Sequence, residues 1–497
     1  MPAQIGTSQQ FFLWDYDSTL FPLRINRLFV DRFASQVLAF IQEEQLTTKN
    51  GFQTQHRVFA TKRGWFLRPT VKLDPIAEFF LYDFVYRHRQ LFQAAPNAKR
   101  AIAGFRIVGG EPIAILKSYS QFKKSAAACR AAYASYVYFD VSAYFNRIYH
   151  HDLVRWFEDV GAAPEEVEIL GKFLRETSGG RSINCLPQGL YPAKMIGSSF
   201  LRFLEDSSRI RCAQTLRLMD DMWFFDNEAQ TLIADFLVAQ ALLSDRGLSV
   251  NEEKSKVLEG HNPDSDMPAD LDEMKIQLLR KRREQLAEAS EYADESESAD
   301  EELEEISDEE QQYLLSLLKK QNIQEEDAEL VLTLMRDHSA DVMEFIPTLI
   351  SEFPSLAKRL YYFCVHATDK TEVTTAILSF LSSKRRVTEY QLFWFGMMAE
   401  EYLLRTPRAG ELLIALYEHK NATEISKAKI LEIAEKRFGL PDLREEQLRS
   451  GQSDWLAWTA AVGSRVHPKG QRNQMLKYFR KCSPMNRIVG EFVESCF

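Results

Sequence analysis

The chain has few cysteines and no long apolar segment. The six cysteines among 497 residues form no CxxC pair, which argues against a structural zinc site and against a small disulfide scaffold. Scattered thiols of this kind fit a reducing cytoplasm. No run approaches the roughly 18 apolar residues of a membrane-spanning helix, and Met1 to Gln10 has neither the basic nor the apolar part of a signal peptide. We therefore expect a cytoplasmic protein without membrane contact.

Basic residues are missing from the stretch Glu291 to Glu310, which instead holds 12 Asp and Glu residues. This stretch accounts for the net charge of −10, because the other 59 acidic residues nearly balance the 61 Lys and Arg residues. The total charge therefore does not exclude a nucleic-acid partner. We expect a solvated loop or frayed helix here. A nucleic-acid mimic and a gate over a basic groove are the alternatives.

The spacing of apolar residues divides the chain into a mixed first half and a helical second half. Leu28 to Phe40 repeats apolar residues at three and four positions, as helices do. Ser135 to Phe139 and Leu216 to Phe225 are aromatic and aliphatic runs typical of strands or hairpins. From Tyr313 onward nearly every segment has helical periodicity. Paired helices of this size suggest a solenoid, although no repeat aligns at a fixed period.

A linker is predicted between these halves. Leu258 to Asp272 is rich in Gly, Asn, Pro, Asp and Ser, and a basic helical piece from Lys275 to Arg283 separates it from the acidic stretch. We therefore divide the chain into residues 1–260, 261–312 and 313–497.

Four short segments in a fixed order carry the chemistry. In chain order they are YFDVSAYFNRIYHHDL (Tyr138 to Leu153), NCLPQGLYP (Asn184 to Pro192), RLMDDMWFF (Arg217 to Phe225) and GLSVNEEKSKV (Gly247 to Val257).

The carboxylates of the first and third segments suggest a metal site. Joining nucleotides requires two divalent ions, which activate an attacking oxygen and stabilise the departing pyrophosphate, and magnesium prefers carboxylate and water oxygens. Asp140 ends a predicted strand, and Asp220 lies in a predicted hairpin turn. The two would meet if those strands were neighbours in one sheet. Taken singly, each aspartate would be read as an ordinary cap or turn residue.

In this order the four segments resemble the palm of reverse transcriptases over about residues 60 to 260. The resemblance implies that Asp140 and Asp220 are the metal ligands, assisted by the backbone carbonyl of Val141. Asp221 would be a partial ligand or would support the other two. The implied cofactor is Mg²⁺ or Mn²⁺, and the implied substrates are deoxynucleoside triphosphates.

The same resemblance gives roles to residues around the carboxylates. Phe145 stands where the family has the aromatic residue that packs beneath the sugar and excludes a 2′ hydroxyl. Gln188 and Gly189 would contact the incoming nucleotide, since a backbone close to a ligand tolerates no side chain. Lys254 would supply a positive charge and a transferable proton to the pyrophosphate. Outside this context, Phe145 would be expected in a helix core and Lys254 on the surface.

Upstream, GWFLRPTVKLDPIAEFFLYDFV (Gly64 to Val85) resembles the fingers of the family. Arg68 and Lys72 would then contact the triphosphate, since a polyanion needs charged donors. Three other basic residues could serve equally, namely Lys62, Arg63 and Arg106.

The layout after Lys254 resembles the bacterial abortive-infection and defence-associated reverse transcriptases, the AbiK-like polymerases. No primer grip or thumb follows the lysine segment. The chain instead continues into the acidic linker and a helical region. That subfamily implies DNA synthesis without a template, started on a hydroxyl of the protein and left attached to it, within a homo-oligomer, in phage defence. Tyr16 is the priming candidate because it lies in a polar, aromatic N-terminal segment, although a packed tyrosine is the ordinary interpretation.

We therefore predict an α+β fold with reverse-transcriptase-like palm and fingers, followed by an all-α domain resembling helical repeats. Two other functions remain open. One is a templated reverse transcriptase that copies an associated noncoding RNA. The other is a defence sensor or toxin that acts by binding through its helical domain. Arg359 and His366 have the spacing of HEPN ribonucleases, but we expect simple packing. For His150 to Asp152 we expect a solvated turn rather than a metal site.

Overall fold

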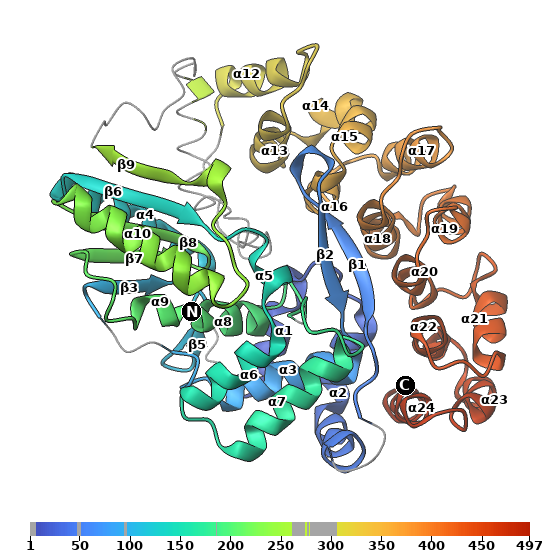
Figure 1. Cartoon of the computed structure of the whole chain (residues 1–497). Helices are drawn as coiled ribbons and strands as arrows, with labels where there is room; N and C mark the ends of the chain where they lie inside the picture. Colours follow the sequence, from blue (N-terminus) through green and yellow to red (C-terminus); the bar gives the residue numbers. More distant parts are fainter. Residues whose placement is uncertain are drawn as a thin grey trace.

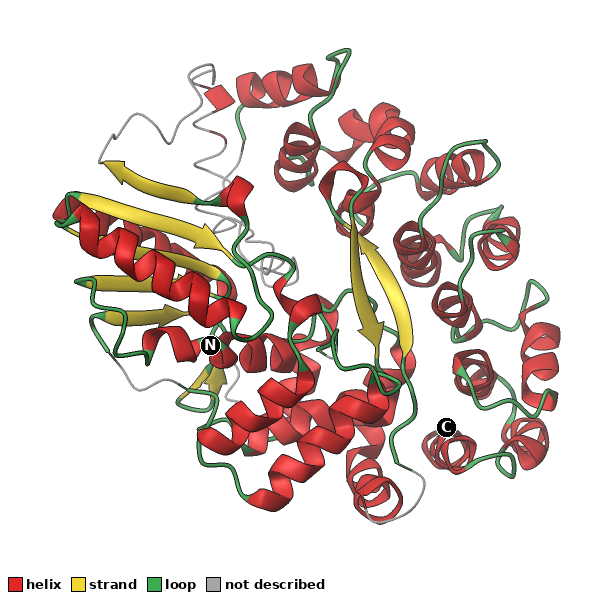
Figure 2. Cartoon of the chain, in the orientation of Figure 1, coloured by secondary structure: helices red, strands yellow, loops and turns green. Residues whose placement is uncertain are grey.

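The computed structural model describes residues 6–46, 51–93, 97–184, 186–260, 274–275, 278 and 306–497. Most of the predicted linker at 261–312, including most of the acidic stretch from Glu291 to Glu310, lies outside these ranges. Every described strand precedes residue 261, and the chain from Asp308 onward is helical (Figure 2). The predicted fold class, an α+β region followed by an all-α region, is therefore confirmed.

The N-terminal part combines three helices with a long hairpin. Its elements are α1 (Ser8–Asp15), α2 (Arg24–Phe40), β1 (His56–Thr61), β2 (Leu67–Lys72) and α3 (Pro75–Arg87). Helix α3 begins where the sequence provides both a cap and a first-turn proline. The carboxylate of Asp74 accepts hydrogen bonds from the amides of Ile76 and Ala77, at 2.9 and 2.8 Å.

A five-stranded sheet forms the centre of the molecule, with strand order β3-β7-β8-β6-β9. Strand β3 is parallel to β7, and the other neighbours are antiparallel. Two of these strands, β6 and β8, correspond to the aromatic runs of the sequence. The bounds are β3 (Arg100–Ala103), β6 (Ser135–Asp140), β7 (Gln214–Leu218), β8 (Asp221–Asp226) and β9 (Lys256–Gly260), and a small hairpin joins β4 (Ile107–Val108) to β5 (Glu111–Pro112).

Helices cover both faces of this sheet (Figure 1). Phe236 of α10 (Ala229–Ser244) contacts the ring of Phe139 at 5.3 Å. Arg130 of α4 (Ile115–Ala132) lies 5.5 Å over the ring of Trp223. Trp223 pairs with Tyr138 across the strands, so it points to the face opposite Phe139. Five helices connect β6 to β7: α5 (Tyr144–Arg147), α6 (His150–Asp159), α7 (Pro164–Thr177), α8 (Tyr191–Phe200) and α9 (Arg202–Glu205).

The C-terminal region is a two-row arc of helices. In the inner row α16, α18, α20, α22 and α24 pack on one another in turn, and α15, α17 and α19 do so in the outer row. No helix in the described part of the chain is long and apolar enough to cross a membrane. The bounds are α12 (Asp308–Leu318), α13 (Glu325–Leu334), α14 (Ser339–Val342), α15 (Ile346–Glu352), α16 (Ala357–Cys364), α17 (Lys370–Leu381), α18 (Glu389–Met398), α19 (Ala409–Glu418), α20 (Glu424–Leu431), α21 (Leu440–Arg449), α22 (Trp455–Gly463), α23 (Lys469–Phe479) and α24 (Pro484–Cys496).

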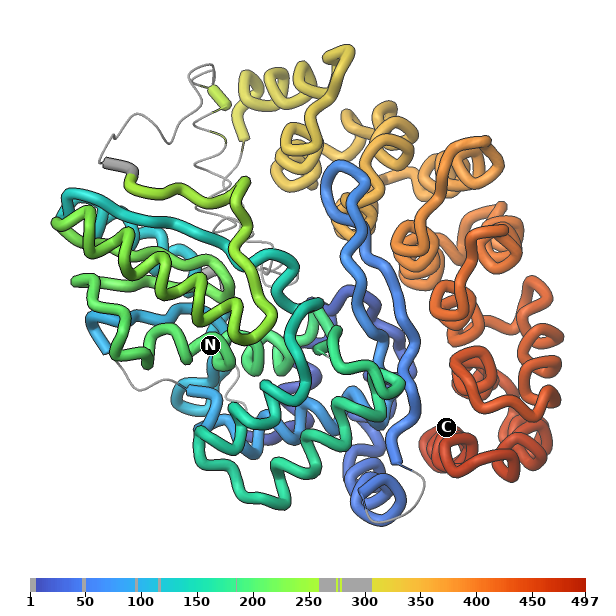
Figure 3. The backbone as a smooth tube through the Cα atoms, in the orientation of Figure 1, coloured from blue at the N-terminus to red at the C-terminus, as the bar shows by residue number. Residues whose placement is uncertain are grey.

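The β1–β2 hairpin packs against the inner side of this arc of helices (Figure 3). The amide of Phe59 donates to a carboxylate oxygen of Glu389 at 3.0 Å. His56 forms an ion pair with Glu424 at 3.2 Å. The hairpin is therefore held along one strand by side chains that follow it by more than 300 residues.

Buried charges join the arc to the start of α2. Glu432 is fully buried, and its carboxylate accepts hydrogen bonds from the amides of Arg24 and Ile25, at 2.9 and 3.0 Å. Lys429 pairs with Glu432 at 2.8 Å and also with Glu400. Buried charges are costly unless they are paired and hydrogen-bonded. This cluster therefore fixes how the helical region sits on the N-terminal helices.

Candidate active site

The sheet brings the three predicted carboxylates to one end. Asp140, the last residue of β6, is the direct cross-strand partner of Asp221, the first residue of β8. Asp220 lies in the two-residue turn that joins β7 to β8. Asp140 and Asp220 are 9% and 5% exposed. Strand β6 is the neighbour of β8 in the sheet, which is the condition under which we expected Asp140 and Asp220 to meet.

Left-handed backbone occurs beside both buried aspartates. Met219, immediately before Asp220, has φ +56°, and Ala143, three residues after Asp140, has φ +49°. Such a conformation is costly for residues with a side chain and persists only where the surroundings enforce it. The turn at Met219 is enforced by a buried arginine. The guanidinium of Arg217 donates to the carbonyl of Met219 at 2.9 Å and forms an ion pair with Glu205.

Tyr138 links the two strands at the level of the carboxylates. Its hydroxyl donates to Oδ1 of Asp221 at 2.7 Å, and its ring lies 4.9 Å from that of Trp223. Burial raises the pKa of the Tyr138 hydroxyl, and the charge of Asp221 raises it further. The charges of Asp140 and Asp220 act in the same direction, so all three carboxylates concentrate negative charge around this hydroxyl.

Asp140 is oriented by the segment that carries Lys254. The amide of Asn251 donates to the backbone carbonyl of Asp140 at 2.7 Å, and its side-chain amide donates to Oδ2 at 3.1 Å. Nζ of Lys254 lies 3.8 Å from the same Oδ2, on a side chain that is 57% exposed. The structure therefore brings the predicted lysine to the predicted metal ligand, with its amine open to solvent.

The residues at this end of the sheet fit a divalent cation. Val141 forms an antiparallel bridge with Val250. The two hydrogen bonds of this bridge use the carbonyl of Asp140 and the amide of Ser142, so the bridge does not use the carbonyl of Val141. Within the described ranges, no three Asp, Glu, His or Cys side chains are grouped so that they could hold a metal by themselves. A magnesium site in a polymerase does not need three such side chains, because one or two carboxylates bind the ion together with substrate phosphates and water. When bound, such ions activate the attacking hydroxyl and neutralise the leaving pyrophosphate.

Phe145 lies on α5, the short helix directly after Asp140, and is 5% exposed. A side chain at Gly197 of α8 would come within 3.1 Å of its ring, so glycine there makes room for Phe145. The adjacent Tyr144 donates to the carbonyl of Gly197 at 2.6 Å. The two aromatics thus fix α5 against α8, and the predicted contact of Phe145 with the sugar stays a prediction.

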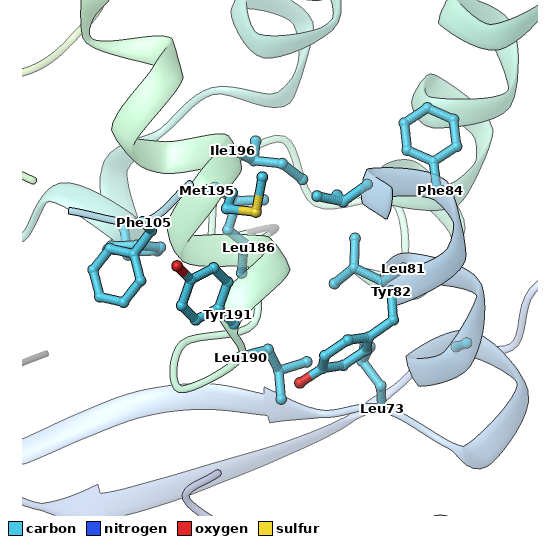
Figure 4. Packing of buried hydrophobic residues seen from close by; sticks show 14 of the residues in the cluster. Leu73, Leu81, Tyr82, Phe84, Phe105, Leu186, Leu190, Tyr191, Met195 and Ile196 are labelled. Carbon is cyan, nitrogen blue, oxygen red and sulfur yellow. The ribbon is translucent and has the colours of Figure 1, made fainter. Parts of the chain in front are cut away.

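The loop around Gln188 is anchored on three sides. Nε2 of Gln188 donates to Oδ1 of Asn146 at 2.7 Å, and its carbonyl accepts from the Thr70 hydroxyl at 3.0 Å. The amide of Tyr191 donates to Asp15 at 2.8 Å. Side chains that flank the loop enter the core beside α3 and α8, as Figure 4 shows for Leu186, Leu190 and Tyr191.

Gly189 is required for a reason that the sequence does not reveal. Its φ is +96°, and a Cβ there would lie 2.7 Å from the side chain of Leu20. Packing of the N-terminal segment therefore already excludes a side chain at this position.

The hairpin places its two predicted triphosphate ligands differently. Arg68 is half-buried on β2. Lys72 is only 4% exposed, and its amine pairs with the buried carboxylate of Glu78 at 2.6 Å. The prediction that Lys72 contacts a triphosphate is therefore wrong. This lysine, three residues before the start of α3, belongs to the core, where Glu78 neutralises its charge.

The priming candidate also lies in the core. Tyr16 is 5% exposed, and burial raises the pKa of its hydroxyl well above the ordinary value. The charge of Glu432 raises it further. A hydroxyl that is buried and hard to ionise is unsuited to attack a nucleotide, so the assignment of Tyr16 is corrected.

The alternative ribonuclease motif is not assembled. The guanidinium of Arg359 is buried and pairs with Glu329 at 2.7 Å. His366 is exposed and lies beyond the end of α16. One side chain therefore lies in the core and the other at the surface, and Arg359 has the packing role that we expected.

Four residues that support the site were not identified from the sequence. Arg217 and Glu205 hold the hairpin turn, Tyr138 binds Asp221, and Asn251 orients Asp140. A charged residue inside the apolar run of β7 was a signal for Arg217, because a buried guanidinium needs a partner. For Tyr138 the signal was its position two residues before Asp140, on the same face of a strand.

One comparison with known proteins, that with family models, agrees with this geometry. Residues 99–296 match the family model described as reverse transcriptase (RNA-dependent DNA polymerase). No curated protein matches the chain. Among solved structures, that of telomerase from Candida albicans in complex with the TWJ fragment of telomeric RNA shares 10% identity, covering 94% of this chain and 70% of its own, with a TM-score of 0.27. The family match spans Asp140, Asp220 and Lys254, and the chain therefore carries a reverse transcriptase domain, an RNA-directed DNA polymerase, at residues 99–296.

Proposed function

We propose that the domain adds deoxynucleotides to a hydroxyl in a reaction that depends on Mg²⁺ held by Asp140 and Asp220. The observation that carries this proposal is the pairing of Asp140 with Asp221 across β6 and β8, which sets Asp220 beside them at one end of the sheet. Lys254, 3.8 Å from Asp140, is suited to give a proton to the pyrophosphate. The Val141 carbonyl completes the proposed ligand set.

The proposed recognition of the nucleotide uses the surroundings of these carboxylates. Phe145 would select the deoxyribose by lying beneath it. Gln188, held by Asn146, would contact the base or sugar, and Arg68 of the hairpin would contact the triphosphate. Gly189 would allow the loop backbone to approach the substrate.

We further propose that the enzyme acts in phage defence, as a homo-oligomer that makes DNA without a template and on its own hydroxyl. Support comes from the helical arc, which follows the polymerase domain and embraces the hairpin. An enzyme without a thumb grips a duplex poorly, because phosphate contacts supply most of the affinity for nucleic acid. A protein primer would remove the need for that grip. The acceptor would be an exposed hydroxyl rather than Tyr16.

The test is to incubate the nuclease-treated protein with Mg²⁺ and a labelled deoxynucleotide and to run a denaturing gel. Label that migrates with the wild-type protein, and is absent from Asp220→Ala, supports untemplated synthesis on the protein. The control Asp245→Ala removes an exposed aspartate outside the site. Label that appears only after RNA and a primer are added supports a templated reverse transcriptase that copies an associated RNA. No label under either condition contradicts both, and favours a binding role for the helical region.

A further inference from the structure

The last two helices of the arc carry a basic surface. Residues 469–496, which span α23 and α24, contain six Lys and Arg residues and two Glu residues. Four of these cations, Lys477, Arg480, Lys481 and Arg487, surround one cavity of about 520 Å³ between α23 and α24. We call this surface the C-terminal basic face. It belongs to the helical region, and Figure 1 shows α23 and α24 on the side of the molecule away from the central sheet.

Two cations of the C-terminal basic face are already neutralised. Arg480 pairs with Glu494, and its second nitrogen lies 3.8 Å from Glu491. Arg487 pairs with Glu44 at 2.8 Å. Lys477 and Lys481 are exposed, and neither forms an ion pair with any residue in the described ranges. These two lysines give the cavity its net positive charge.

Polar atoms without hydrogen-bond partners lie in and below this face. Nε of Arg480 and Oδ1 of Asn473, both at the cavity, are buried and have no partner within the described part of the chain. Arg472, on the same helix, is 2% exposed, and neither its Nε nor its Nη2 has a partner there. Leaving a buried donor unsatisfied costs about 1–3 kcal/mol. The donor at the cavity itself, Nε of Arg480, suits a ligand rich in oxygen, whereas Oδ1 of Asn473 is an acceptor.

An aromatic ring stands at the edge of the same face. Tyr478 follows Lys477 on α23, and its side chain is 57% exposed. Gln474 lies one helical turn before it, and Lys481 lies in the turn that follows the end of α23. Cations that hold phosphates, combined with an exposed ring on which a base can stack, are typical of single-stranded nucleic-acid binding.

We propose that the C-terminal basic face binds a single strand of nucleic acid, with phosphates on Lys477 and Lys481 and a base stacked on Tyr478. The proposal rests on the proposed function in one respect, since the DNA made by the polymerase is a strand of this kind. The face would hold that strand at a distance from the carboxylates.

The test measures the binding of a fluorescein-labelled oligothymidylate to the full chain over a range of salt concentrations. In the double variant Lys477→Glu/Lys481→Glu we expect affinity to fall about tenfold or more. The slope of log affinity against log salt should fall by about 1.4, because each phosphate contact on a single strand contributes about 0.7. Tyr478→Ala should weaken binding without changing the slope.

The matched control is Lys420→Glu/Lys436→Glu, which makes the same charge change at exposed positions elsewhere in the arc. We expect it to bind as the wild type does. Equal losses in both double variants, or none in either, would overturn the proposal. The proposal would also be overturned if a polyglutamate peptide bound the wild type as tightly as the oligothymidylate does and lost affinity only in Lys477→Glu/Lys481→Glu. This measurement involves no DNA synthesis. The binding proposal can therefore fail while the polymerase proposal holds, and the polymerase proposal can fail while the binding proposal holds.

Discussion

The hydroxyl of Tyr138 donates a hydrogen bond of 2.7 Å to Oδ1 of Asp221, the residue that faces Asp140 across the central sheet. This bond holds the Asp221 carboxylate in a fixed orientation at the start of β8, directly after the turn that carries Asp220. Tyr138 does not touch the substrate in this account, so it acts as a positioning residue.

Replacing Tyr138 with Phe should therefore slow nucleotide addition about tenfold, since a hydrogen bond to a charged group contributes ~1.5 kcal/mol. The Mg²⁺ concentration for half-maximal rate should rise, which a purely structural role would not cause. Tyr133→Phe is the control, because its half-buried ring packs on Phe225 away from the carboxylates. An unchanged magnesium dependence in Tyr138→Phe would contradict the positioning role.

Lys254 should matter for the rate more than for substrate binding. We expect Lys254→Ala to lower kcat about 100-fold, the range of general acid catalysis. Lys254→Arg keeps the positive charge but has no proton to give near neutral pH. It should therefore recover only part of the rate. Full recovery of kcat in Lys254→Arg would contradict the proton-donating role and would leave Lys254 with a charge role alone.

Phe145→Ala should reduce discrimination against ribonucleotides. The ratio of kcat/KM for a deoxynucleotide to that for the matching ribonucleotide should fall about tenfold or more, because a ring beneath the sugar no longer blocks the 2′ hydroxyl. The variant also leaves space beside Gly197, so thermal melting must be recorded in parallel. A stable variant with unchanged selectivity would move the discriminating role to another residue.

Much of the site was predictable because its residues lie in short, ordered segments. The strand ending at Asp140 and the hairpin around Asp220 follow from aromatic and apolar runs interrupted by acids. Lys254 follows from its segment. The prediction for Lys72 failed because the burial of its amine depends on the ion pair with Glu78. This partner is six residues away, and the motif does not specify it. Tyr16 failed because its surroundings include Glu432, which only the folded chain brings near.

The ion pair between Arg217 and Glu205 should be essential for both stability and activity. Both side chains are buried, so Glu205→Gln leaves an uncompensated guanidinium below the turn that carries Asp220. We expect the free energy of unfolding to fall by about 3 kcal/mol, measured by urea denaturation. Glu228→Gln, at an exposed position, is the control. Equal stability of the two variants would contradict this role.

The contact of the hairpin with the helical arc should depend on pH through His56 and Glu424. The hydrogen bond that His56 donates to the Glu424 carboxylate raises the pKa of His56. The contribution of this pair to stability is therefore complete below the ordinary histidine range and is lost as pH rises through the raised value. The pKa of Glu424 is lowered by His56 against the opposing effect of burial, so its share is lost at acidic pH. The difference in melting temperature between wild type and His56→Gln should therefore be largest near pH 5.5 and shrink toward pH 8.5. A difference that grows with pH would contradict the pairing.

The most direct test of the account is the rate of Mg²⁺-dependent deoxynucleotide incorporation in Asp140→Asn, Asp220→Asn and Asp245→Asn. These variants remove one negative charge each with little change in shape. The account predicts a loss of about a thousandfold or more in the first two, since removing a carboxylate metal ligand disables the chemistry, and no loss in the third. Incorporation at the wild-type rate in folded Asp140→Asn or Asp220→Asn would show that the chemistry lies elsewhere in the chain.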